Sequence, residues 1–105
     1  MRGGRADTAV VLLWGMAVVA GCGGPLPQVP RENVRYAQAL RTAANGGDPE
    51  GLETVARTID RAARDGLIGP AEMAVYEEIL ALGRARKFAD AEERCLAFLR
   101  EQARR

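Results

Sequence analysis

The chain has 105 residues, of which 15 are basic, 14 are acidic and none is histidine. This length accommodates one small domain, and the near balance of charges lacks the basic excess of a nucleic-acid-binding domain. The absence of histidine removes the usual general base and the commonest zinc ligand. We therefore expect no catalytic residues, no metal, no other cofactor and no nucleic-acid partner.

The first 21 residues are typical of a secretory signal peptide. Arg2 and Arg5 precede residues 9–20, a run of twelve uncharged residues. That length lies within the roughly 7–15 residues of a signal-peptide core and below the roughly 20 that a membrane-spanning helix needs. The sequence therefore predicts a cleaved leader over residues 1–21. Thirteen basic and thirteen acidic residues remain after it.

The leader is followed directly by a cysteine, in the order Val19-Ala20-Gly21-Cys22. Ala20 and Gly21 are small enough for a peptidase to close around an extended backbone, and Val19 supplies an aliphatic side chain before them. These four residues resemble the lipobox of bacterial lipoproteins. The resemblance implies cleavage between Gly21 and Cys22 and attachment of a diacylglycerol to the Cys22 thiol.

The same resemblance implies a lipid-anchored protein of the bacterial cell envelope that faces the periplasm or the exterior. Several fatty acyl chains, such as palmitate, would hold it in the bilayer at about 0.8 kcal/mol for each buried methylene. The alternative is an ordinary signal peptide cut near Ala20. In that case Cys22 carries no lipid and a disulfide between Cys22 and Cys95 becomes possible.

Residues 22–30 are rich in proline and glycine and include Pro25, Pro27 and Pro30. Three prolines in six residues exclude a helix and favour extended polyproline geometry. At about 3.1 Å per residue, eight such residues reach roughly 25 Å. We expect this segment to be a tether between the lipid and the domain.

Residues 31–105 predict an all-α domain, a small array of three to four antiparallel amphipathic helices. The first predicted helix covers residues 31–44 and has an apolar face made mostly of alanine. The second begins with Asp48 as a cap and Pro49 in its first turn, and it ends at Gly66.

Charged pairs four residues apart are expected on the exposed side of the second helix, between Glu53 and Arg57 and between Asp60 and Arg64. The third helix begins at Pro70, and its apolar residues cover an arc of about 200°. An arc that wide needs partners on two sides, so we expect this helix to be central. The last helix carries its apolar face at Phe88, Ala91, Cys95, Phe98 and Leu99.

Residues 79–99 resemble a tetratricopeptide-type helical hairpin. Phe88-Ala89-Asp90-Ala91 matches the aromatic-x-x-Ala start of the second helix of that hairpin, and Arg86 stands where the family usually has glycine. From Pro30 to Pro70 is 40 residues, which differs from the 34 of that repeat. The resemblance implies protein or peptide binding, without assigning any binding residue.

Two kinds of charged cluster are candidate sites. The neighbouring carboxylates Glu77-Glu78 and Glu92-Glu93 point about 100° apart on a helix, which favours solvated faces over catalysis. The basic group of Arg84, Arg86 and Lys87 favours a helix end that faces the acidic start of the next helix over a phosphate site. Cys95 is interpreted as a small buried apolar residue.

The sequence as a whole predicts a membrane-anchored helical lipoprotein that binds another envelope protein as an accessory module. The alternative is a structural envelope component that assembles with itself through the apolar remainder of the first and last helices. The two readings share the lipid anchor at Cys22 and the helical domain, and they differ in the partner.

Overall fold

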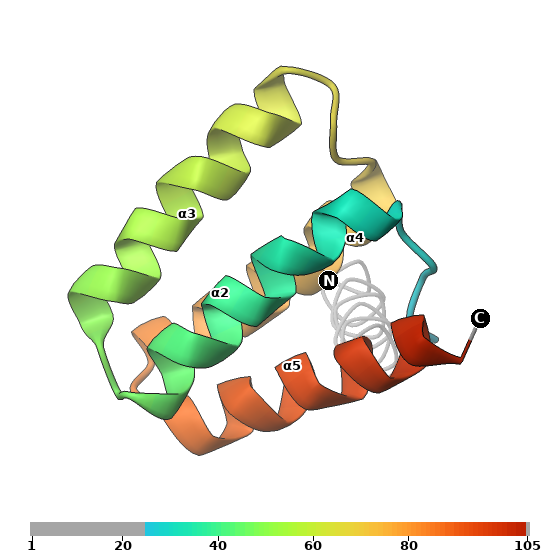
Figure 1. Cartoon of the computed structure of the whole chain (residues 1–105). Coiled ribbons are helices and arrows are strands. Elements are labelled where there is room, and N and C mark those ends of the chain that lie inside the picture. Colours follow the sequence, from blue (N-terminus) through green and yellow to red (C-terminus); the bar gives the residue numbers. More distant parts are fainter. Residues whose placement is uncertain (1–24, 105) are drawn as a thin grey trace, which may run out of the picture.

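The computed structural model describes residues 25–104, which form one short 3-10 helix and four α-helices and contain no strand. The elements are η1 (Arg31–Asn33), α2 (Val34–Asn45), α3 (Pro49–Arg64), α4 (Pro70–Arg84) and α5 (Phe88–Ala103). Figure 1 shows them as an array in which short turns join successive helices. The predicted all-α fold class is confirmed.

The start of α3 follows the sequence prediction. Asp48 is extended, and its side chain accepts a 3.0 Å hydrogen bond from the N–H of Gly51, while Pro49 occupies the first helical position. This bond pairs one of the four N–H groups that a helix start leaves without a partner in the helix.

The three turns between helices share one backbone device. In each, the residue after the helix cap has a positive φ: 57° at Gly47, 79° at Gly66 and 65° at Arg86. The N–H of the next residue donates to a carbonyl five residues earlier at all three ends, which is the Schellman arrangement. Glycine adopts this conformation freely, whereas the Cβ of Arg86 makes it strained.

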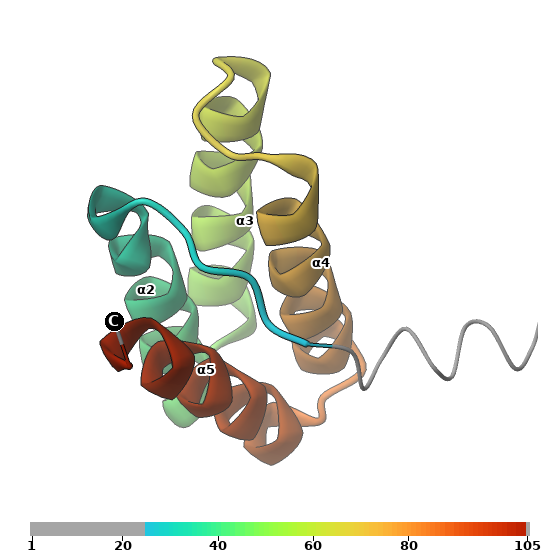
Figure 2. The same ribbon diagram turned by 90° about the vertical axis from the view of Figure 1, so that its right-hand side faces the viewer.

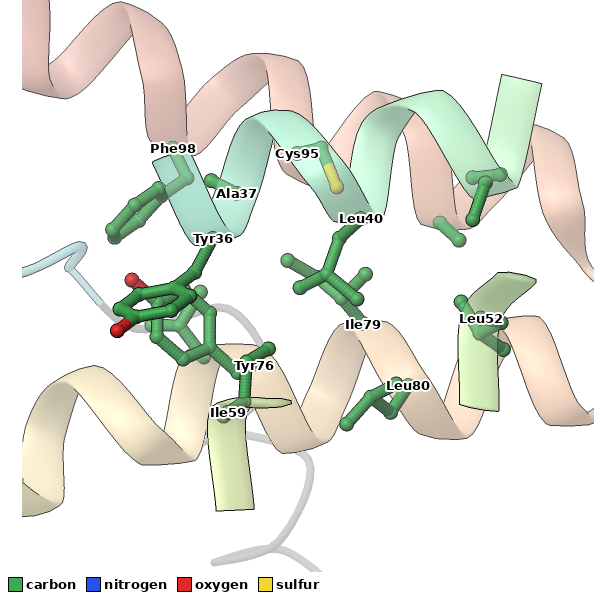
Figure 3. Packing of buried hydrophobic residues seen from close by; sticks show 14 of the residues in the cluster. Tyr36, Ala37, Leu40, Leu52, Ile59, Tyr76, Ile79, Leu80, Cys95 and Phe98 are labelled. Atoms are coloured by element: carbon green, nitrogen blue, oxygen red, sulfur yellow. The ribbon is translucent and has the colours of Figure 1, made fainter. Parts of the chain in front are cut away.

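The core is shared between α2 and α4, each of which contacts the other three α-helices. The sequence predicted α4 alone as the central helix. Ala37 and Leu40 of α2 are completely buried. The small alanine side chains of this helix let the neighbouring helices approach closely. Figure 3 shows Leu40 beside Ile79 of α4 and Cys95 of α5 in the interior.

Three aromatic rings from three helices form one edge-to-face series in the core. The ring centroids of Tyr36 and Tyr76 are 6.2 Å apart, and those of Tyr76 and Phe98 are 5.8 Å apart, with interplanar angles near 70°. This geometry is favourable for aromatic pairs. The rings therefore tie α2, α4 and α5 together near one end of the array (Figure 3).

The contact between α3 and α4 depends on a glycine. A Cβ added to Gly83 would lie 2.6 Å from Cδ2 of Leu52, which is itself buried. The absence of a side chain at Gly83 is therefore what lets α3 approach α4 at this point.

The ion pairs follow the prediction in part. Asp60 and Arg64 pair at 3.4 Å, as expected for residues one turn apart. Glu53, however, is bound by Arg84 of α4 rather than by Arg57. The turn between α3 and α4 reverses the chain, so that Arg84 at the end of α4 lies beside Glu53 near the start of α3. The planar guanidinium of Arg84 makes two bonds to the Glu53 carboxylate, of 2.7 and 2.8 Å.

Residues 25–30, which we call the strap, lie against the helices instead of standing free as a tether. Val29 is buried and Leu26 packs against the core. Figure 2 shows the strap crossing between α5 and α4. The expected extended geometry is present at Pro30, with φ −56° and ψ 142°. In this docked arrangement residues 25–30 do not act as a spacer, because their backbone groups and alternate side chains are bound by α4 and α5. Residues 22–24 of the predicted tether lie outside the described part of the chain.

Replacing Arg86 with glycine is expected to stabilise the protein by about 0.5–1 kcal/mol. The left-handed conformation costs a non-glycine residue about 1–2 kcal/mol, and the greater freedom of glycine in the unfolded chain offsets part of that gain. Urea unfolding would measure the difference. Arg57→Gly, at an exposed position in the middle of α3, is the control and should destabilise by about 1 kcal/mol. A similar loss in Arg86→Gly would contradict the account of the turn.

Candidate functional site

The residues of the predicted lipidation site lie outside the described part of the chain. Val19, Ala20, Gly21 and Cys22 all precede residue 25, where the description begins. Lipid attachment and signal cleavage therefore stay predictions. Among residues 25–104, no helix is long and apolar enough to span a bilayer.

In each pair of neighbouring carboxylates, one member is exposed to solvent and the other forms an ion pair with a residue of another helix. Glu77 and Glu93 are exposed, while Glu78 pairs with Arg94 at 3.2 Å and Glu92 pairs with Arg41 at 3.7 Å. The two carboxylates of a pair thus face different surroundings. Within the described residues, no group of three or more acidic or cysteine side chains could hold a metal ion.

The basic cluster at the end of α4 is likewise separated into different roles. Arg84 binds Glu53, and this hydrogen bond lowers the pKa of the Glu53 carboxyl and raises the pKa of Arg84. Arg86 occupies the left-handed position of the turn. Lys87 lines a groove on the outer side of α4. The cluster therefore does not converge on one ligand.

We call this groove the α4 groove. It has a volume of about 920 Å³ and runs along α4 past Ala71, Ala74, Ala81 and Ala85, with residues 25–27 of the strap on one side. From residue 71 to residue 85 the helix rises about 21 Å, at 1.5 Å per residue. The groove is therefore about as long as four turns of helix.

The α4 groove is the uncovered part of the wide apolar arc of α4. The helix turns Tyr76, Ile79 and Leu80 into the core. Val75 and Leu82 lie at the edge of the core and also line the groove. The four alanines beyond them are exposed. An exposed helix face is normally polar, whereas this one is apolar along these four alanines.

Charged side chains border the groove. Glu77 is exposed on one margin and Lys87 is exposed near the α4–α5 turn. The carboxylate of Glu78 is already bound by Arg94 of α5. The groove thus offers an apolar floor with an acidic group and a basic group at separate positions.

The strap is fastened to α5 chiefly by an amide clamp. The Gln102 side chain accepts a 3.0 Å hydrogen bond from the Val29 N–H and donates a 2.8 Å bond to the carbonyl of Pro27. The side chain of Gln28 donates to the carbonyl of Glu101 at 2.8 Å. Gln102 and Val29 are both buried, so water competes little for these bonds.

The C-terminal end of the strap is fixed by a buried carboxylate that the sequence analysis did not identify. Glu72 is 4% exposed, and its oxygens accept a 3.1 Å bond from the Asn33 side chain and a 2.6 Å bond from the Tyr76 hydroxyl. Asn33 also donates to the carbonyl of Leu67. Burial, together with the bond to Glu72, raises the pKa of Tyr76 well above its ordinary value.

Two sequence signals for this network were present. Asn33 lies where the prolines end, and Glu72 and Tyr76 are one turn apart on the apolar side of their helix. A carboxylate in the first turn of a helix is usually a surface group that favours the dipole. Because this explanation predicts an exposed side chain, the sequence did not indicate that Glu72 is buried. Its burial depends on the donor that Asn33 supplies from a distant part of the sequence.

Cys95 lies in the core, as expected from the sequence. It is completely buried, and burial raises the pKa of its thiol to about 12. A thiol in this state is protonated at neutral pH and is neither a good nucleophile nor a metal ligand. Cys95 is therefore a packing residue.

Comparison of the chain with protein-family profiles, curated proteins and solved structures finds no match. The resemblance of Val19-Ala20-Gly21-Cys22 to a lipobox and that of residues 79–99 to a tetratricopeptide hairpin therefore stay predictions from the sequence.

Removing the hydroxyl of Tyr76 is expected to destabilise the protein by about 1–3 kcal/mol, because Tyr76→Phe leaves a buried oxygen of Glu72 without its donor. Tyr36→Phe is the matched control. The Tyr36 hydroxyl is contacted by the Arg35 side chain rather than by a buried carboxylate, so its loss should cost under about 0.5 kcal/mol. Chemical unfolding of both variants measures the difference, and equal losses would contradict the assigned role of Glu72.

Proposed function

We propose that this protein is a lipid-anchored helical module of the bacterial envelope that binds another envelope protein in its α4 groove, without catalysis. The observation that carries the proposal is the apolar groove beside the strap. Pro25 lines the groove and follows the proposed lipidation site by only three residues. Three extended residues span about 10 Å, so the groove would lie next to the bilayer surface.

The composition of the groove indicates the chemistry of its partner. A row of alanines leaves shallow spaces that larger aliphatic side chains can fill, since well-packed helix contacts alternate large and small residues. The groove is as long as about four helical turns. We therefore expect an amphipathic helix with leucine or isoleucine along one face, a basic residue opposite Glu77 and an acidic residue opposite Lys87.

A second copy of this chain fits the groove less well. Two α4 helices in contact would place alanine against alanine and bury little apolar area. An antiparallel pair centred on the groove would also bring the Glu78 carboxylates of the two copies together. Self-assembly is therefore the alternative, and the experiments below separate it from binding of a different protein.

The lipid anchor is tested by the intact mass of the protein extracted from membranes of its native host. The expected mass is that of residues 22–105 plus a diacylglycerol, with or without a further acyl chain. A mass for the same residues without lipid would indicate a secreted protein and would contradict the anchor. The mass of the full chain would mean that the leader is retained.

Docking is tested by a photoreactive amino acid placed at Ala74 in the full-length protein in its native membranes. Crosslinking at this position should produce a covalent complex with one other protein. The complex should be lost when a second substitution, Ala81→Arg, places charge in the apolar floor. Ala89 is an exposed alanine outside the groove, and the same photoreactive residue there should give no such complex.

The crosslinked peptide, identified by mass spectrometry, is expected to come from a helix with large aliphatic residues on one face. A complex between two copies of this chain would support self-assembly instead. Equal crosslinking from the Ala74 and Ala89 positions, or none from Ala74, would contradict the groove as the docking site.

A further inference from the structure

We propose that the strap is a releasable spacer, held by Gln102, that sets how far the domain stands from the membrane and whether the α4 groove has its second wall. In the closed state, residues 25–30 lie on α4 and α5. In the released state they become the extended tether that their proline content favours. The membrane part of this inference rests on the proposed lipid anchor at Cys22, whereas release of the strap itself does not.

The contacts of the strap are concentrated on a few groups. Pro25, Pro27 and Pro30 have no N–H to donate, so the strap cannot pair regularly with its neighbours as a strand or helix does. Gln102 binds the strap on both sides of Gln28, through the carbonyl of Pro27 and the N–H of Val29. One side chain thus holds two backbone groups, and its loss would free both.

Proline restricts the free strap, so the docked and released states differ little in conformational entropy. A proline-rich chain is already extended when free, so the strap loses less conformational freedom on docking than an ordinary segment and needs fewer contacts to remain docked. For the same reason, release requires no refolding. The strap leaves as an extended chain, and the helices keep their own hydrogen bonds.

Release would change the reach of the anchor. With the strap docked, Pro25 follows Cys22 by three residues, and three residue steps reach at most about 10 Å. With the strap free, the nine residues from Cys22 to Arg31 span about 28 Å at 3.1 Å each. The domain could then stand nearly three times as far from the lipid as it does in the closed state.

Release would also alter the docking site. Residues 25–27 form one side of the α4 groove, and Leu26 packs against the core at that side. Without the strap, the groove opens toward α5 and loses part of its apolar wall. A single movement therefore couples distance from the membrane to the shape of the partner site.

The experiment compares Gln102→Met with the native protein by amide hydrogen exchange. Methionine has nearly the length and shape of glutamine but makes neither of the two hydrogen bonds. Exchange of the Val29 amide is expected to accelerate about tenfold or more, while amides in the middle of α5 keep their native rates. The control is Gln38→Met on the exposed side of α2, which should leave Val29 unchanged.

Unchanged exchange at Val29 in Gln102→Met would overturn the proposal. Faster exchange throughout α5 would also overturn it, because it would mean that Gln102 maintains the helix rather than holding the strap. Faster exchange confined to the strap supports the releasable clamp, whether or not the protein carries lipid.

The spacer role is measured on the lipidated full-length protein in vesicles. A dye attached at Arg61→Cys, an exposed position on α3, reports its distance to acceptor dyes in the bilayer by energy transfer. Cys95 is completely buried and does not compete for the label. Transfer should be lower in Gln102→Met than in the native protein or in Gln38→Met.

The outcomes separate this inference from the proposed function. Equal transfer in a protein whose mass includes the lipid would overturn the spacer role while leaving the anchor intact. A mass without lipid would overturn the anchor and the spacer role together, and the clamp would stand or fall on the exchange result alone.

Discussion

The structure depends most on the buried carboxylate of Glu72. A carboxylate removed from water is costly unless donors surround it, and here Asn33 and Tyr76 provide them from the start of α2 and from α4. Asn33 also binds the carbonyl of Leu67 in the loop before α4. Two regions distant in sequence, residue 33 and residues 67–76, must therefore meet at one point, and this junction sets how α2 lies across α4.

The position of the strap follows from that junction. The strap ends directly before η1, whose last residue is Asn33, so the Glu72 contacts hold its C-terminal end. Gln102 holds its middle on α5. An extended chain fixed at these two places has little choice of path, and it passes beside α4. The apolar groove thus arises from fixation of the strap together with the alanines that α4 does not bury.

Local features were predictable because their causes are local. The cap of α3 and the turns at Gly47 and Gly66 each depend on residues within a few positions of one another, and these were placed correctly. The first helix was predicted from residue 31, but it begins as the 3-10 helix η1 and is α-helical only from Val34. Arg86 follows the same principle, although arginine is unusual at such a position. The turn requires a residue in the left-handed backbone conformation, and Arg86 adopts that conformation. The cross-helix pair of Glu53 with Arg84 was missed because Arg57 is nearer in sequence, whereas in the structure the Arg57 side chain bonds the Thr54 hydroxyl.

The sequence by itself indicated that residues 31–104 are helical and where most of these helices begin and end, and it is the only basis for the prediction that Cys22 accepts a lipid. These follow from hydrophobic period, turn chemistry and a four-residue motif. Only the tertiary structure decided that Glu72 is buried, that residues 25–30 lie on the helices and that the rest of residues 25–104 leaves one face of α4 uncovered. Each of these depends on which segments meet across long sequence separations, and no local pattern specifies the partner of a buried carboxylate or of an extended strap.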